Sequence, residues 1–156
     1  MSSSKFDDAG NFGTLCFEGD YAIRYAHEDV VLAWNGGMIN IGRHYGNPNA
    51  AVMDVGEGWC VTGGSGLTIN LFERGFPKAG EPVKDFPFRT LNLWDACNPP
   101  PDGRDCWFVE GLWFRLSERD ADGKLVRVLV HALVEPGSER AGLYEVELLT
   151  RQWRRI

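Results

Sequence analysis

The chain has 156 residues, of which 44% are hydrophobic and 24% charged, and this size and balance are those of one globular domain with a single core. They exclude a disordered or a fibrous protein. The formal net charge of −6 would repel a phosphate backbone, so nucleic acid is not expected as a partner.

Residues 1–13 are polar and rich in Ser, Asp and Gly, and we expect them to form a flexible N-terminal arm before a single β domain over residues 14–156. No stretch has the length of a membrane span, and the start of the chain lacks the apolar core of a signal peptide. The sequence therefore predicts a cytoplasmic protein without a membrane partner.

The first clear elements form hairpins. Residues 21–27 alternate between two faces, as a strand with one buried face requires. Residues 30–34 and 38–42 flank Asn35 and Gly36, and Asn-Gly is the strongest short hairpin signal, because both central residues of a type I′ turn need positive φ. Two strands joined by a type I′ turn are therefore predicted here.

A second set of short strands is predicted over residues 50–55, 59–62 and 67–73. The glycine-rich run 63–66 separates the last two, and it reads as a plain hairpin turn because it has neither the Lys nor the following helix of a phosphate loop. The hairpins share residues at a constant offset, which a duplicated β unit would explain: Val31/Val61, Gly36/Gly66, Ile39/Ile69, Asn40/Asn70 and Ile41/Leu71.

The last part of the chain predicts a strand over residues 88–94, a long hairpin of residues 106–117 and 124–135 closed by an Asp-Gly turn, and a strand over 143–150. Both faces of residues 126–134 are partly apolar, which predicts a central strand covered on both sides. A helix over residues 143–153 is the alternative for the C-terminal segment.

Many short antiparallel strands, with turns about ten residues apart, predict an all-β fold that is mainly antiparallel: a single-domain sandwich or barrel, built from hairpins and a C-terminal meander. Aromatic residues favour strands, and the chain has six Trp, nine Phe and four Tyr. Nineteen Gly and eight Pro supply the many turns that short strands require.

The four cysteines separate into two pairs. Cys16 and Cys60 lie inside apolar runs, where a free cysteine behaves as a small buried hydrophobic residue. Cys97 and Cys106 bracket a Pro-rich loop and would meet across its neck as a disulfide or as half of a metal site, although zinc sites normally show closer spacing. No metal site and no cofactor are predicted.

The sequence contains no Walker loop, G-x-S-x-G, H-E-x-x-H or paired C-x-x-C motif, so it predicts no catalytic residues. Among the histidines, His44 is the candidate for binding, because with Tyr45 it lies in a loop rich in hydrogen-bonding groups. The carboxylates Asp54 and Glu57 flank a turn and would suit a hydrolase pair or a hard cation, but without diagnostic spacing.

The Pro-rich loop is the best candidate for a recognition surface. Trp94 and Trp107 flank it, and Asp95, Asp102 and Asp105 crowd it. Exposed tryptophans dominate protein interfaces, so these side chains would anchor a partner. The alternative is that both tryptophans are buried beneath the loop.

These features favour a non-enzymatic module that binds another protein, with acidic side chains steering a basic partner. A small, acidic single domain without catalytic motifs resembles, in composition, the immunity proteins that neutralise bacterial toxins, and this resemblance implies a toxin as the partner. One alternative is a small-molecule-binding barrel or small hydrolase with a site near the 43–49 loop. A third is self-association through exposed strand edges, which would give a homodimer.

Overall fold

The computed structural model describes residues 12–44, 46, 48–94, 107–136 and 139–156. Within these residues the protein consists of strands that form three antiparallel four-stranded sheets, so the all-β expectation is confirmed. The described part of the chain contains no helix long and apolar enough to cross a membrane. The predictions for residues 1–11, for Tyr45 and for the loop 95–106 concern residues outside those that the structure describes.

Each sheet is a meander of four strands that follow one another in the chain. The first sheet contains β1 (Gly13–Glu18), β2 (Tyr21–Ala26), β3 (Asp29–Trp34) and β4 (Gly37–Arg43). The second contains β5 (Ala50–Asp54), β6 (Trp59–Gly64), β7 (Gly66–Leu71) and β8 (Arg89–Leu93). The third contains β9 (Val109–Arg119), β10 (Leu125–Val134), β11 (Gly142–Glu147) and β12 (Gln152–Arg155).

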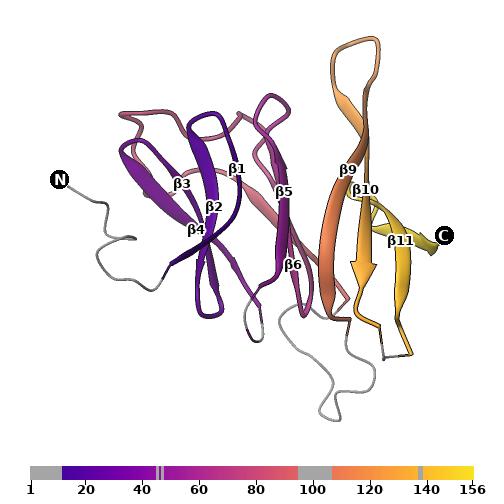
Figure 1. Cartoon of the computed structure of the whole chain (residues 1–156). Coiled ribbons are helices and arrows are strands. Elements are labelled where there is room, and N and C mark those ends of the chain that lie inside the picture. Colours follow the sequence, from indigo (N-terminus) through magenta and orange to yellow (C-terminus); the bar gives the residue numbers. More distant parts are fainter. Residues whose placement is uncertain (1–11, 45, 47, 95–106, 137–138) are drawn as a thin grey trace.

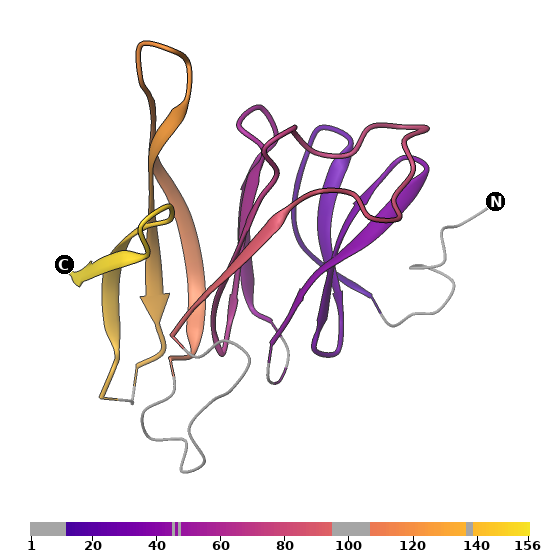
Figure 2. The ribbon, with the colours of Figure 1, turned by 180° about the vertical axis from the view of Figure 1, so that it is seen from behind.

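The three sheets lie side by side, with the second between the other two (Figures 1 and 2). One apolar core joins the second and third sheets, and another joins the first and second. Every residue of β6 and β7 is buried as a result. The second sheet is thus the doubly covered layer of the fold.

The sequence analysis instead predicted that residues 126–134 form a central strand that is covered on both sides. The strand that forms there, β10, does lie between β9 and β11 within its sheet. However, only the face with Val128, Val130, Ala132 and Val134 packs into a core shared with another sheet. On its other face, Leu129 is buried and Leu133 half-buried, but neither belongs to a core shared with another sheet, a difference that periodicity alone cannot reveal.

Polar residues of β6 and β7 face the first sheet and are buried with hydrogen-bond partners. The Asn70 Nδ2 donates to the carbonyl of Ile41 in β4 at 2.8 Å, and Thr90 donates to the Asn70 Oδ1 at 3.2 Å. Because a buried polar group without a partner is costly, these bonds allow a sequence that alternates apolar and polar residues to be buried on both faces.

One predicted turn has a different type from the one expected, and a second forms as expected. Gly36 has a φ of 103°, but Asn35 does not have a positive φ, so the predicted hairpin forms without a type I′ turn. The glycine-rich run is a hairpin turn as expected, since Gly64 pairs with Gly66. The amide of Gly66 donates to the carbonyl of Trp107 at 2.6 Å, which joins this turn to the residues just before β9.

The C-terminal segment forms the hairpin β11–β12, so the helical alternative is wrong. Glu147 fixes the turn: its carboxylate accepts the amides of Leu149 at 3.0 Å and Thr150 at 3.2 Å. The amide of Leu148 donates to Val128 at 2.9 Å and keeps the segment on β10. Helix propensity is a weak preference, and these tertiary bonds override it.

The repeat in the structure differs from the repeat in the sequence. The sequence similarity aligns β3 and β4 with β6 and β7. These are the third and fourth strands of one sheet and the second and third of the next. The similarity therefore concerns hairpins, while the structural unit is the whole four-stranded meander.

The two described cysteines are both part of the core between the first and second sheets, as predicted. Burial raises the pKa of the Cys16 thiol to about 11. Burial also raises the pKa of Cys60, which lies deeper. Both are therefore thiols, not thiolates, at neutral pH.

Candidate functional site

The predicted binding residue His44 is part of the packing between sheets. It is only 1% exposed, and its Nε2 lies 3.0 Å from the Thr62 Oγ1 while its Nδ1 lies 3.3 Å from the carbonyl of Ser65. Because a carbonyl only accepts, Nδ1 carries the proton and Nε2 accepts from the hydroxyl. Burial lowers the pKa of His44, so the neutral form is favoured.

The start of the candidate loop at residues 43–49 is likewise held by the fold. Glu28 accepts from the amide of Gly46 at 3.0 Å and from Arg43 at 2.7 Å, and these two hydrogen bonds, that of Gly46 first, hold the pKa of Glu28 below its ordinary range. The amide of His44 donates to the carbonyl of Glu28 at 2.9 Å. The described groups at the start of this loop, those of Arg43, His44 and Gly46, are thus bonded to Glu28 in the turn between β2 and β3.

Trp94 and Trp107 are buried, each 7% exposed, and their rings stack 4.4 Å apart. Tyr144 and Trp153 meet this pair edge to face. Trp94 has a φ of 62°, which a bulky residue adopts only when its surroundings hold it there. Of the two alternatives, the structure favours burial. Asp95, Asp102, Asp105 and Tyr45 lie outside the described residues.

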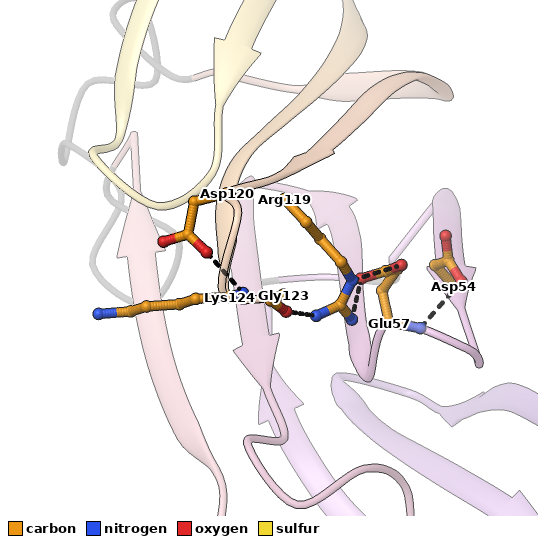
Figure 3. A network of polar contacts seen from close by, with 6 residues as sticks. All are labelled: Asp54, Glu57, Arg119, Asp120, Gly123 and Lys124. Carbon is orange, nitrogen blue, oxygen red and sulfur yellow. Dashed lines mark hydrogen bonds and ion pairs between the residues drawn. The ribbon is translucent and has the colours of Figure 1, made fainter.

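Asp54 and Glu57 do not form a pair of facing carboxylates. The Asp54 Oδ1 accepts the amide of Glu57 at 3.1 Å and so closes the turn between β5 and β6. The carboxylate of Glu57 forms an ion pair with Arg119 in the third sheet (Figure 3). Each carboxylate therefore has a different structural partner.

This ion pair crosses a cleft of about 600 Å³ between the second and third sheets. Residues of the β5–β6 turn and of the β9–β10 hairpin line the cleft, and both turns lie at the same end of the sheets (Figure 1). The residues that line it are Glu57, Gly58, Trp59, Leu71, Phe72, Glu73, Arg89, Arg119, Gly123, Lys124, Leu125 and Leu149.

The β9–β10 turn forms one wall of the cleft. The Asp120 Oδ1 accepts the amides of Asp122 and Lys124, each at 2.9 Å, and Gly123 takes a φ of 81°. Arg119 also donates to the carbonyl of Gly123 (Figure 3). Arg119 thus links this turn to Glu57 across the cleft.

The other cations of the cleft are more accessible. Arg89 lies 3.6 Å from Glu73, and both side chains are largely exposed. The side chain of Lys124 extends away from the Arg119–Glu57 pair (Figure 3). Among the described residues, no ion pair involves Lys124, so its ammonium faces solvent at the cleft.

The floor of the cleft is apolar and contains one unused donor. Trp59 is fully buried, and its ring packs 5.7 Å from that of Phe114. The Trp59 Nε1 is buried without a hydrogen-bond partner among the described residues. An unsatisfied buried donor costs about 1–3 kcal/mol, and because Trp59 is fully buried, this donor is not accessible from the cleft.

The sequence analysis missed the cleft. From the sequence, Arg119 and Lys124 were predicted only to belong to a hairpin, and Arg89 only to belong to a strand. The lining residues come from five separated parts of the chain, and no local pattern reveals that they meet. The only local signal was the acidic turn with Glu57 before Trp59.

A second candidate surface is the outer face of the third sheet, which points away from the core. Trp113, His131, Glu145 and Arg154 pair across β9, β10, β11 and β12 and so form one row on this face. The Glu145 carboxylate accepts from the Arg154 Nε at 3.1 Å and lies 3.8 Å from the His131 Nε2. Trp113 ends the row and is 49% exposed.

Gly111 lets the Trp113 indole lie against its own strand. A Cβ placed on Gly111 would be only 2.8 Å from the Cη2 of Trp113, so a larger residue would displace the ring. The six-membered ring of the indole therefore lies next to the backbone of Gly111, and about half of the Trp113 side chain stays exposed. A ring that is already held in place loses little conformational entropy when a partner covers it.

The described residues contain no group of three or more His, Cys, Asp or Glu side chains that would hold a metal ion. The pairing of Cys97 with Cys106 remains a prediction outside the described residues. In comparisons with protein-family models, with curated proteins and with solved structures, no match to this chain was found.

Proposed function

We propose that this chain is a cytoplasmic, non-enzymatic module that binds another protein through the outer face of its third sheet. The observation that carries the proposal is Trp113, a half-exposed indole packed beside Gly111 on a sheet face that neither of the other two described sheets covers. Tryptophan is the residue type most enriched among the side chains that dominate binding energy.

Trp113 takes the anchoring role that the sequence gave to Trp94 and Trp107, whose rings are buried against each other. The charged side chains beside Trp113 suit the rim of an interface. Glu145 and Arg154 form an ion pair on the same row, and Arg154 is largely exposed. Rim charges of this kind set the partner's orientation more than its affinity.

The partner proposed is a protein with a basic surface. The net charge of −6 accelerates encounter with such a partner and makes the association sensitive to salt. The compositional resemblance to immunity proteins suggests a toxin as the specific partner. In that case the chain would block the toxin's activity, and the Trp113→Ala variant would not.

The test is affinity capture from host lysate with three tagged baits: the native chain, Trp113→Ala and Phe17→Ala. Phe17 is a matched control because it is a strongly exposed aromatic residue on the first sheet. We expect one stoichiometric protein on the native and Phe17→Ala baits, released by high salt and absent from Trp113→Ala. Capture that is unaffected by Trp113→Ala, or no captured protein, contradicts the proposal.

A further inference from the structure

We infer that Asn35 is a site of spontaneous covalent modification, at which the side-chain amide is hydrolysed through a cyclic imide formed with the main-chain nitrogen of Gly36. The only co-reactant is water, and no enzyme is required. Asn35 and Gly36 form the turn between β3 and β4 in the first sheet, whereas the proposed protein anchor lies on the third sheet. The inference therefore goes beyond the proposed protein binding.

The reaction has two steps. The Gly36 nitrogen gives its proton to a base in the solvent and attacks the Asn35 Cγ; the bond from Cγ to the side-chain nitrogen breaks and ammonia leaves, which closes a five-membered imide. Water then adds to one of the two imide carbonyls, and the bond from that carbon to the Gly36 nitrogen breaks. Addition at Cγ gives an ordinary aspartate at position 35. Addition at the main-chain carbonyl gives isoaspartate, whose main chain runs through the side-chain carbon.

The turn leaves both reacting groups accessible. Asn35 and Gly36 are both exposed. Among the described residues, neither the Asn35 side chain nor the Gly36 amide forms a hydrogen bond. Gly36 has no Cβ to hinder the approach of Cγ to its nitrogen, and it takes a φ of 103° that other residues rarely adopt. The electrophile and the nucleophile are thus adjacent, unbonded and unhindered.

The other asparagines of the described residues lack these properties. The side chain of each one forms a hydrogen bond. The residue that follows each one carries a side chain and belongs to a strand, where the extended backbone is held by its sheet. These asparagines are Asn40, Asn49, Asn70 and Asn92. Asn35 therefore differs from them in both its side chain and its neighbour.

The Asp122–Gly123 pair shows that a glycine in a hairpin turn is not sufficient. An aspartate followed by glycine can form the same imide, but its carboxylate is a poorer electrophile than an amide. In addition, the Gly123 amide donates to the carbonyl of Asp120 at 3.0 Å, which holds the attacking nitrogen in place. The structure thus favours modification at Asn35 over Asp122.

The two products differ in their effect on the fold. Aspartate at position 35 adds only a negative charge at an exposed turn. Isoaspartate adds one carbon to the main chain between Trp34 and Gly37, which pair directly across β3 and β4. A Cβ on Gly37 would lie 2.8 Å from the Cζ2 of Trp34, whose side chain belongs to the core between the first and second sheets. The longer connection disturbs this contact, so the isoaspartyl form should be less stable.

The test is incubation of the native chain at neutral pH, followed by peptide mapping with electron-transfer dissociation, which distinguishes aspartate from isoaspartate. Asn40 and Asn92 are internal controls, because both are exposed but hydrogen-bonded. We expect conversion at Asn35 to be about tenfold faster or more than at either control, a difference of about 1.4 kcal/mol in activation free energy. Asn35→Gln should abolish conversion in this peptide, because glutamine would have to form a larger ring.

A parallel sample unfolded in urea separates the effect of the structure from that of the sequence. Conversion at Asn35 in urea but not in the native chain would show that the turn protects Asn35, and it would overturn the inference, as would equal rates at Asn35, Asn40 and Asn92 in the native chain.

The isoaspartyl form, isolated by chromatography, should unfold at a lower urea concentration than the native chain, whereas Asn35→Asp should unfold as the native chain does. Equal urea midpoints for all three would contradict the predicted effect on the turn. None of these readouts uses a partner protein, so this inference and the proposed function fail separately.

Discussion

His44 shows how a loop residue with the composition of a binding site becomes structural. Its two partners, Thr62 and Ser65, lie 18 and 21 residues further along the chain, so the sequence around His44 gives no sign of them. The expectation that loops display binding residues was reasonable, but it assumes exposure. Trp94 and Trp107 illustrate the same limit, because their burial depends on Tyr144 and Trp153.

The burial of His44 predicts a pH dependence of stability. Its pKa in the folded chain is below the ordinary value of 6.5, so the unfolded chain binds the proton more tightly and stability falls as pH decreases below about 6.5. The loss from this one group is at most about 1.4 kcal/mol per pH unit. Urea unfolding at pH 7.5, 6.5 and 5.5 measures it.

The control for this prediction uses the other histidine at a turn. His27 is exposed with a φ of 55°, a conformation that asparagine tolerates, so His27→Asn should retain the pH dependence. His44→Gln should lower stability at pH 7.5 and flatten the profile between pH 7.5 and 5.5. An unchanged profile in His44→Gln would show that His44 is not its source.

At the scale of elements, the hairpins were predictable because their signals are local. Asn35-Gly36 and Asp122-Gly123 mark turns whose strands pair with their neighbours in the chain, and alternation indicates the strands on either side. The packing of one sheet on another was not predictable. It depends on contacts between residues that are far apart in the sequence and follow no regular spacing. Gly63 is an example: it lies in β6 where Val109 of β9 approaches most closely.

This close approach predicts a large difference between two glycine substitutions. A Cβ on Gly63 would lie 2.6 Å from the Cγ1 and 3.0 Å from the Cβ of Val109, so Gly63→Ala forces β6 and β9 apart and should cost about 1–3 kcal/mol. Gly56 is the matched control, because its nearest atom would be 3.5 Å away. Gly56→Ala should change the free energy of unfolding by less than about 0.5 kcal/mol. Denaturant unfolding measures the free energy of unfolding of both variants. Equal stabilities of the two variants would contradict the close contact between β6 and β9 at Gly63.

At the scale of the whole molecule, the sequence supports the fold class but not the arrangement of sheets. Short strands and frequent turns indicate antiparallel β structure, and the all-β expectation is confirmed. Strand order within each meander follows chain order, but which sheet lies in the middle depends on the burial of Thr62, Thr68 and Asn70. Their polar side chains suggest an exposed face, and only long-range hydrogen bonds make their burial possible.

The central position of the second sheet predicts the slowest hydrogen exchange in β6 and β7, which lie between both cores. The strand β12, whose residues are all exposed at the edge of the third sheet, should exchange fastest among the strands. Mass-spectrometric exchange at neutral pH provides the comparison. Protection of β12 equal to that of β6 would contradict the layer order.

The measurement that tests the central claim most directly is calorimetric titration of the purified partner into the native chain and into Trp113→Ala. An anchoring tryptophan contributes at least about 2 kcal/mol when truncated, so Kd should rise about thirtyfold or more in Trp113→Ala. Phe17→Ala should bind as the native chain does, and all three chains should show equal unfolding free energies. An unchanged Kd for Trp113→Ala would contradict binding through the outer face of the third sheet.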